Sequence, residues 1–232
     1  MDIPNAEPSA ANLVSRALRD ALGVLLPVAC VGCGEADAAL CDSCLASVPD
    51  APAVRELAGP FPVWAATEYN GVVRRAVLAL KNEQRTDVAA PLGHLLRRAF
   101  DTALLELPSR ADTVSDLELA TIPSSRSAYR RRGYRPVDRV LAKAGLVAQH
   151  PLALARQPDD QIGLGIAGRQ RNLVGSLRAS GRAAGRTFLL VDDVVTTGAT
   201  LLEARRALGQ AGARVLGAVV LAATPRRILP PS

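Results

Sequence analysis

The sequence predicts an α/β fold, in which a mostly parallel sheet flanked by helices follows a small four-cysteine finger. Apolar runs of strand length alternate with segments of helical period, which is the pattern of strand–helix–strand units. The apolar run over 187–191 ends on two acids and a hydroxyl-rich turn. All four cysteines lie within fifteen residues near the start of the chain. A length of 232 residues allows one sizeable domain and a small appendage.

The composition is that of a core-forming globular chain, 49% apolar and 22% charged, with a net charge of +6. Lys81 and Lys143 are the only lysines, so arginine carries almost all of the positive charge. Arginine binds phosphate through paired N–H groups, which favours anionic ligands, although a GC-rich genome would also enrich arginine. No apolar run reaches the roughly 18 residues that cross a bilayer, and we expect a cytoplasmic protein.

The chain divides into four predicted parts. A proline-containing linker over 47–60 is predicted between the finger and the main domain. Polar residues at the start predict disorder. Helical spacing of Leu13, Ala17 and Ala21 predicts an amphipathic helix over 10–26, ahead of the cysteines. The parts are a disordered start (1–12), the helix and finger (13–50), the main domain (61–223) and a proline-rich tail (224–232).

The main domain is predicted to alternate strands with helices, which requires a parallel sheet with crossover connections. Two segments break the alternation: an arginine-dense loop over 124–136 and a long loop with a short helix over 157–186. The expected strands are 61–69, 117–123, 152–156, 187–191 and 213–223, and the expected helices are 71–82, 86–107, 136–149 and 199–212.

The cysteines form two Cys-x-x-Cys pairs, Cys30 with Cys33 and Cys41 with Cys44. Zinc takes four ligands at tetrahedral corners, and two such turns bring four thiolates together from short loops. We therefore predict a structural zinc site. Four protein ligands leave no open position, so we expect no catalysis at the metal. Disulfides and an iron–sulfur cluster are the alternatives.

The acid pair and the turn after it predict a sugar-phosphate site. Asp192 and Asp193 are expected at the carboxyl end of a buried parallel strand, where ligands of α/β sheets bind. Backbone N–H groups and threonine hydroxyls can cradle a phosphate, which Gly198 allows to approach closely. Carboxylates repel phosphate, but they can accept hydrogen bonds from two ribose hydroxyls or hold a metal ion. The alternative is that a threonine caps a helix and the acids begin a loop.

VDDVVTTGAT resembles the signature with which type I phosphoribosyltransferases bind phosphoribosyl pyrophosphate (PRPP). The resemblance implies that Asp192 and Asp193 bind the ribose hydroxyls, that 196–200 hold the 5′-phosphate, and that Mg²⁺ accompanies PRPP. The implied PRPP-binding set is Asp192, Asp193, Val194, Val195, Thr196, Thr197, Gly198, Ala199 and Thr200.

A four-cysteine finger before such a domain resembles the ComF family, and so do segments 69–83, 130–144 and 156–172. The resemblance implies the type I phosphoribosyltransferase fold with a hood over its site. Many members carry Asn-Gln after Arg-Gly-Phe, where this chain has Arg135 and Pro136 after Tyr134. The implied pyrophosphate or hood contacts are Lys81, Arg126, Arg130, Arg132, Arg156, Arg169 and Asn172.

Two functions follow. The first is a Mg²⁺-dependent phosphoribosyltransferase, or PRPP sensor, with an unknown acceptor and a DNA-uptake context that the family resemblance implies. The second is a non-catalytic protein that contacts single-stranded DNA or the uptake machinery through its arginines; aromatic residues make up only 3%, which weighs against a stacking groove. We expect neither His94 nor His150 to be catalytic, and we find no Ser/His/Asp triad.

Overall fold

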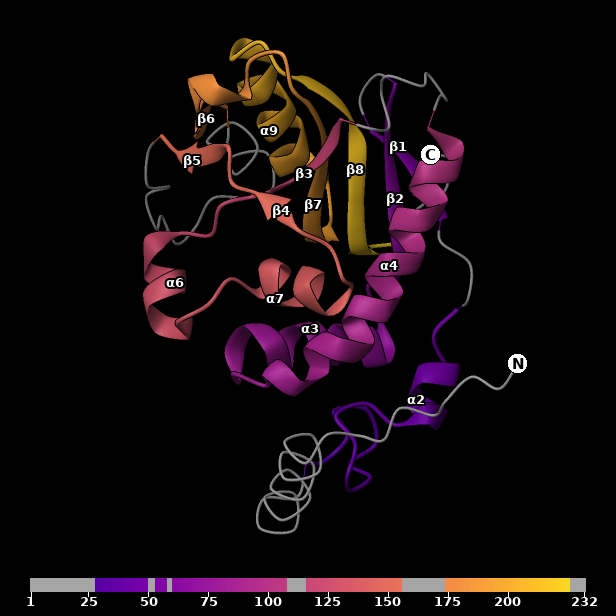
Figure 1. Ribbon diagram of the computed structural model, residues 1–232. Coiled ribbons are helices and arrows are strands. Elements are labelled where there is room, and N and C mark those ends of the chain that lie inside the picture. The colour runs from indigo at the N-terminus through magenta and orange to yellow at the C-terminus, as the bar shows by residue number, and fades with distance from the viewer. Residues whose placement is uncertain (1–27, 50–52, 58–59, 108–115, 156–173, 226–232) are drawn as a thin grey trace, which may run out of the picture.

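The computed structural model describes residues 28–49, 53–57, 60–107, 116–155 and 174–225 (Figure 1). Several predictions fall outside these residues and stay predictions. They are the disordered start (1–12), the helix over 10–26, the hood side chains Arg156, Arg169 and Asn172, and positions 226–232 of the tail. In the described part of the chain, no helix is both long and apolar enough to cross a membrane.

A six-stranded sheet in the order β1-β2-β8-β7-β3-β4 forms the centre of the molecule (Figure 1). Only the β1–β2 pair is antiparallel, so the predicted parallel sheet is confirmed. Its strands are β1 (Ala53–Leu57), β2 (Phe61–Glu68), β3 (Leu117–Thr121), β4 (Ala148–Gln149), β7 (Thr187–Val195) and β8 (Arg214–Ala223).

Helices cover both faces of the sheet, which explains why residues 188–191 of its central strand β7 are all apolar. On one face, Leu189 and Val191 of β7 pack with residues of α3 (Gly71–Asn82), α4 (Ala89–Glu106) and α7 (Pro136–Lys143). On the other, Phe188 and Leu190 pack against α9 (Ala199–Gln210). A short 3-10 turn, η1 (Thr86–Val88), leads into α4. The predicted helices 71–82, 86–107 and 199–212 are thus present with small shifts of their ends.

The linker predicted over 47–60 contains a strand. Residues of β1 pair with β2 from Ala53↔Ala65 to Leu57↔Phe61. The three prolines flank this strand and do not interrupt it, and an edge strand tolerates prolines beside it. The sheet therefore begins before residue 61, the expected start of the main domain.

The loop predicted over 124–136 contains a helix, α6 (Arg126–Arg132). The hydroxyl of Ser125 accepts a hydrogen bond from Ala128 N (3.2 Å) and caps the helix start, and Gly133, at φ +75°, ends it. The next helix, α7, stops at Lys143 and does not reach 149, because Gly145 turns the chain at φ +70° into β4. Local capping therefore sets both ends of α6, and a turn at Gly145 follows the end of α7. In the sequence, the density of arginines concealed the caps of α6.

A second, two-stranded antiparallel sheet joins β5 (Leu152–Leu154) to β6 (Leu177–Ala179). The described end of the predicted long loop thus forms β6 and a 3-10 turn, η2 (Gly181–Ala183). Buried Glu203 of α9 fixes this sheet to the helix, because Leu177 N donates to its carboxylate (3.0 Å). Arg206 donates both to Glu203 and to the Leu177 carbonyl.

The cysteine finger contains one short helix, α2 (Asp42–Ala46), and docks against α3. Arg75 donates to the Val31 carbonyl (3.1 Å), and Arg85 donates to the Ala29 carbonyl (2.8 Å). Val72 of α3 packs against the buried cysteines. The finger is therefore fixed to the helix that borders the candidate site.

We predict that Gly93→Ala destabilises the protein by about 1–3 kcal/mol, because overpacking a close contact forces backbone to move. A Cβ at position 93 of α4 would lie 2.9 Å from Ala144 N and from the Lys143 backbone, beside α7. Urea unfolding measures the change. Gly209→Ala in α9 is the matched control, since nothing lies within 4 Å of its Cβ and alanine gains about 0.5–1 kcal/mol of helix propensity. Equal stability of the two variants would contradict the predicted close contact.

Candidate functional site

Strand β7 is longer than predicted and carries the acid pair within it. The sequence placed the end of the strand at residue 191, but β7 pairs with β8 as far as Val195↔Ala223. Asp192 and Asp193 therefore lie in the last part of a hydrogen-bonded strand, near its carboxyl end. The strand positions both carboxylates more rigidly than a loop would.

The two carboxylates have different surroundings. Asp193 forms an ion pair with Lys81 at the end of α3 (Oδ2–Nζ 2.6 Å). Asp192 accepts a hydrogen bond from Asp193 N (2.9 Å). Burial, together with the negative charge of Asp193, raises the pKa of Asp192 to about 7, against the lowering effect of that N–H and of Lys81. The pair therefore carries less negative charge at neutral pH than two exposed aspartates would.

The threonine–glycine turn begins where β7 ends. Gly198 has φ +79° and is the N-cap of α9, and its carbonyl accepts from Leu202 N (2.9 Å). Thr197 Oγ1 accepts from Ala199 N (3.3 Å), and the side chains of Thr196 and Thr197 are exposed. The start of a twelve-residue helix thus lies next to exposed hydroxyls, as an anion site requires.

A second observation favours glycine at position 198. A Cβ there would lie 2.3 Å from Leu57 Cδ1, since the edge strand β1 packs over the turn. The tight fit depends on a strand that the sequence did not predict. The left-handed backbone conformation favours glycine at this position, and a side chain there would also force Leu57 to move.

A small cavity adjoins the acids. Its walls are apolar side chains of α3, α4, α7 and β8, while Lys81, Asp192 and Asp193 supply its charged groups. The apolar members are Val77, Leu80, Leu96, Pro136, Val137, Val140 and Leu221. A ligand held by the acids would therefore meet a largely apolar surface on the α3 and α7 side.

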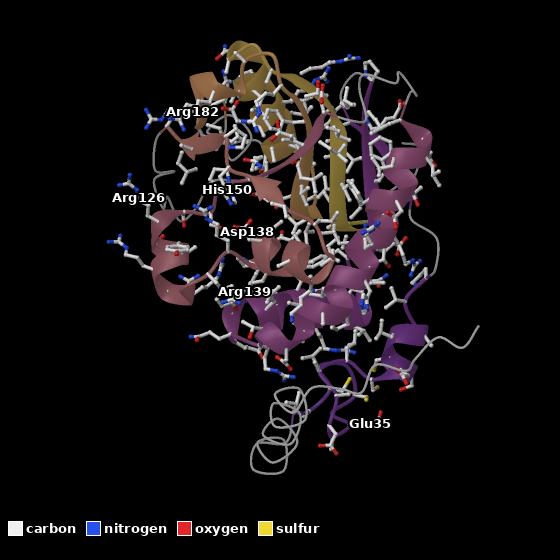
Figure 2. The ribbon with its side chains drawn as sticks, in the orientation of Figure 1. Glu35, Arg126, Asp138, Arg139, His150 and Arg182 are labelled. Carbon is white, nitrogen blue, oxygen red and sulfur yellow. The ribbon has the colours of Figure 1, made fainter. Side chains whose placement is uncertain are left out.

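The structure brings only part of the predicted basic set to this site. Arg132 donates to the carbonyl of Lys81 (2.7 Å), and the Tyr134 hydroxyl donates to the Leu80 carbonyl. Arg126 and Arg130 are exposed on α6, and Figure 2 shows Arg126 pointing away from the domain. Lys81 thus contacts the acid pair directly and Arg132 contacts the backbone of Lys81, whereas Arg126 and Arg130 are exposed on α6.

The four cysteines form a compact cluster whose sulfur atoms all lie within 4.8 Å of one another. Cys33 Sγ and Cys41 Sγ are 3.5 Å apart, close to the roughly 3.8 Å between ligands of a tetrahedral zinc–thiolate centre. A Cβ at Gly32 would lie 2.4 Å from Cys44 Sγ, so only glycine fits there. The cluster could bind zinc.

Backbone groups prepare one of these thiols for a metal. Burial alone would raise the pKa of Cys30, but N–H groups of Cys41, Cys33 and Gly32 point at its sulfur and bring the pKa to about 6. Burial raises the pKa of Cys44 to about 12. A cation among the sulfurs would favour the thiolate form of all four.

Three polar side chains that the sequence did not single out as a group lie together at the edge of the sheet. Thr121 Oγ1 is 2.9 Å from His150 Nδ1, and His150 Nε2 is 3.5 Å from Asp138 Oδ2 (Figure 2). The only sequence signal was that 121 lies within a predicted strand (117–123) and that 150 follows a predicted helix (136–149). Their separation in the chain hides the pairing.

Comparison with known proteins agrees with this geometry. Residues 130–232 match the phosphoribosyl transferase domain family. The chain is 34% identical over 123 residues to an orotate phosphoribosyltransferase of Methanopyrus kandleri, covering 53% of this chain and 52% of that protein, about half its length. It is 29% identical over 202 residues to the DNA utilization protein YhgH of Escherichia coli strain K12, covering 79% and 85%.

A crystal structure of a phosphoribosyltransferase from Corynebacterium diphtheriae is 19% identical and covers 64% of this chain and 70% of that one, with a TM-score of 0.31. That score is too low to support an argument, so the assignment of the fold depends on the sheet order and the family match. The chain contains a phosphoribosyl transferase domain of the type I fold. Its four-cysteine cluster and its similarity to DNA utilization proteins support the resemblance to ComF-like phosphoribosyltransferases.

We predict that Asp192→Asn removes a component of the pH dependence of stability. The pKa of Asp192 is about 7 in the folded protein and near its ordinary value of 3.8 when unfolded, so the folded state binds more protons between these values. Raising the pH through this window therefore lowers the free energy of unfolding of the wild type. The asparagine variant should gain at least about 1 kcal/mol relative to the wild type between pH 4.5 and 7.5.

Urea denaturation across this pH range measures the difference. Asp101→Asn is the control, because Asp101 is a half-exposed partner of Arg97 on α4. If the Asp192→Asn and wild-type curves stayed parallel at every pH, the raised pKa would be refuted.

Proposed function

We propose that this protein binds PRPP with Mg²⁺ at the end of β7 and transfers the phosphoribosyl group to an acceptor, in a DNA-utilization context. The observation that carries the proposal is the acid pair followed by the Gly198 turn at the start of α9. A parallel sheet presents both at its carboxyl edge, where ligands of such folds bind. The names of the relatives support the same class of activity and context.

The turn would hold the 5′-phosphate. Its backbone N–H groups lie at the positive end of α9, and the Thr196 and Thr197 hydroxyls are exposed beside them. The left-handed conformation of Gly198 and the absence of a side chain let the phosphate approach the backbone. Val194, Val195, Ala199 and Thr200 complete the proposed binding segment.

The acids would bind the ribose hydroxyls and exchange partners when PRPP arrives. In the free protein, Lys81 neutralises Asp193. Ribose hydroxyls and Mg²⁺ would offer the carboxylates hydrogen bonds and a hard cation in place of that ammonium group. Lys81 would then be available to the pyrophosphate, next to Arg132, which already donates to its carbonyl. The apolar cavity walls would exclude water from the ribose.

Positioning and charge stabilisation account for the chemistry that the protein must supply. C1 of the ribose gains positive character as the bond to pyrophosphate lengthens, and the acceptor provides the nucleophile. Bound Mg²⁺ would neutralise charge on the leaving pyrophosphate. The chain itself holds the ribose by the acids and the phosphate by the turn, which keeps C1 in place for attack.

Calorimetric titration with PRPP and Mg²⁺ tests the proposal. We expect the wild type to bind and Asp192→Asn/Asp193→Asn to bind at least about 100-fold more weakly, because two charge-assisted hydrogen bonds contribute roughly 1.5–3 kcal/mol each. Gly198→Ala should also weaken binding, whereas Gly209→Ala, at the other end of α9, should not. A wild type that does not bind PRPP would refute the proposed function.

We also propose that Cys30, Cys33, Cys41 and Cys44 hold one structural zinc ion. The sulfur spacing, the N–H donors at Cys30 and the glycine at position 32 support it. A closed set of four thiolates fits a structural role. Because Arg75 and Arg85 bind finger carbonyls, the metal would also keep the finger docked on α3.

Metal analysis of freshly reduced protein should give one zinc per chain. Gly32→Ala should lower the zinc content, since its Cβ would overlap Cys44 Sγ, while Gly181→Ala, whose Cβ has open space, should leave it unchanged. Less than about half an equivalent in the wild type, or equal zinc in both variants, would count against a tetrahedral thiolate site.

A second candidate function is binding of single-stranded nucleic acid by α6. This helix buries none of its residues, presents exposed Arg126, Arg130 and Arg131, and leaves Tyr129 48% exposed beside Arg135. Guanidinium groups that neutralise phosphates beside one aromatic ring suit a single strand. The DNA-utilization relatives favour this possibility too.

Fluorescence anisotropy with a labelled poly-dT oligonucleotide tests it. Arg126→Ala/Arg130→Ala should weaken binding and reduce the slope of log K against log salt by about 1.4, the value for two lost phosphate contacts on a single strand. Arg97→Ala/Arg214→Ala removes the same charge elsewhere and should leave the slope nearer that of the wild type. Equal losses in both variants would show a non-specific charge effect and exclude α6 as the binding surface.

A further inference from the structure

From the sequence we expected no catalytic role for His150, but its contacts with Thr121 and Asp138 change that expectation. We propose that His150, oriented by Thr121 and stabilised by Asp138, removes the proton from the acceptor during phosphoribosyl transfer. The inference rests on the proposed function and assigns the site a group that it otherwise lacks. An acceptor that forms a bond to C1 through N–H or O–H must lose that proton. The acids are committed to the ribose and the turn to the phosphate, so a separate base is needed.

The sheet register places these side chains beside the PRPP candidate site. Thr121, the last residue of β3, pairs with Val191 of β7, immediately before Asp192. On the other side, Ala120 pairs with Gln149 of β4, so His150 follows on directly. All three strands run parallel, and their carboxyl ends meet at one edge.

His150 also lies at the boundary between the two sheets. Pro151 and β5 follow it, and β5 belongs to the small antiparallel sheet beside the central one. Asp138 lies on α7, next to Val137, which lines the cavity beside the acids. The histidine thus lies between β4, α7 and the small sheet.

The hydrogen-bond geometry suits a general base. Thr121 is buried, and its hydroxyl can accept from His150 Nδ1–H, which leaves the lone pair on Nε2. The His150 side chain is 43% exposed, so Nε2 can meet a ligand. Asp138 Oδ2 lies 3.5 Å from Nε2, and Arg135 lies 3.8 Å from the same oxygen.

The two carboxylate oxygens of Asp138 have different surroundings. Its Oδ1 is buried and has no hydrogen-bond partner among the described residues. Its other oxygen, Oδ2, faces His150 Nε2 and would accept a hydrogen bond from the N–H of the imidazolium once that forms. The 3.5 Å separation can shorten when the histidine gains its proton, as catalytic hydrogen bonds do in complexes.

The step balances without any further reactant. The acceptor's N or O forms a bond to C1, the bond from C1 to the pyrophosphate oxygen breaks, and pyrophosphate leaves with that electron pair. The acceptor's proton moves to His150 Nε2, and Asp138 stabilises the imidazolium until solvent removes the proton. His150 is the catalytic residue, and Thr121 and Asp138 are positioning residues.

Water is the acceptor available for a test, because hydrolysis of PRPP releases pyrophosphate. His150→Ala should reduce the rate of pyrophosphate release by about 100-fold or more, the range for loss of a general base. The Kd for PRPP with Mg²⁺, measured by calorimetry, should change less than about 2-fold. Free imidazole should restore at least a tenth of the lost rate. His94→Ala, an exposed histidine on α4, is the control.

Two substitutions at Thr121 distinguish its role in orienting His150 from its role in packing. Thr121→Val keeps the shape of a buried side chain and removes its hydroxyl, so it should slow pyrophosphate release about 10-fold, whereas Thr121→Ser should stay within about 3-fold of the wild type. Asp138→Asn should also slow release with little effect on Kd.

Each other outcome has a distinct meaning. Wild-type release in His150→Ala, or a loss that imidazole does not rescue, would overturn the assignment of His150. PRPP binding by the wild type without any pyrophosphate release would overturn it too, while leaving PRPP binding intact. Failure of the wild type to bind PRPP would refute the proposed function itself.

Discussion

Strand β7 is buried on both faces, and the rest of the site follows from that constraint. Helices α3, α4 and α7 cover one face and α9 the other, so residues 188–191 have no polar surface to offer. Polar chemistry on this strand can occur only where the covering helices end. The acids therefore lie at its carboxyl end, and their partial burial follows from the same packing, which raises the pKa of Asp192.

Helix α3 connects features that are far apart in the sequence. Its middle contacts the finger, since Arg75 donates to Val31. Its last turn gives Lys81 to Asp193 and two carbonyls to Tyr134 and Arg132. One helix thus fixes the positions of the finger, the acid pair and the segment between α6 and α7. This arrangement gives a physical reason for a finger and the proposed sugar-phosphate site to occur in one chain.

The sequence predicted the structure well where the residues of a candidate site are close together in the chain. The stretch from Thr187 to Thr200 predicted a strand, a turn and a helix, and all three are present, although the strand continues to Val195 instead of ending at residue 191. The cysteine pairs likewise predicted a cluster that could hold a metal. Roles of individual residues in PRPP binding stay predictions, since they concern a ligand.

What the sequence missed depends on contacts between distant residues. Leu57 lies over Gly198 only because β1 joins the sheet, and prolines nearby favoured a linker. Thr121, Asp138 and His150 come from β3, α7 and the segment after β4, and only the register of the sheet brings them together. Neither a period nor a motif marks such a group before the fold is known.

The departure from the ComF family pattern at Arg135 and Pro136 now has a structural interpretation. Pro136 is the first residue of α7, where a fixed φ favours the helix start, and it also lines the cavity beside the acids. Arg135 lies over the Tyr129 ring (5.9 Å) and 3.8 Å from Asp138 Oδ2. An arginine here therefore links α6 to the carboxylate that faces His150, a link that an uncharged asparagine would not make through charge. The departure thus lies on the proposed acceptor side of the site, while Asp192 to Thr200, the proposed ribose and 5′-phosphate contacts, keep the pattern of the resemblance.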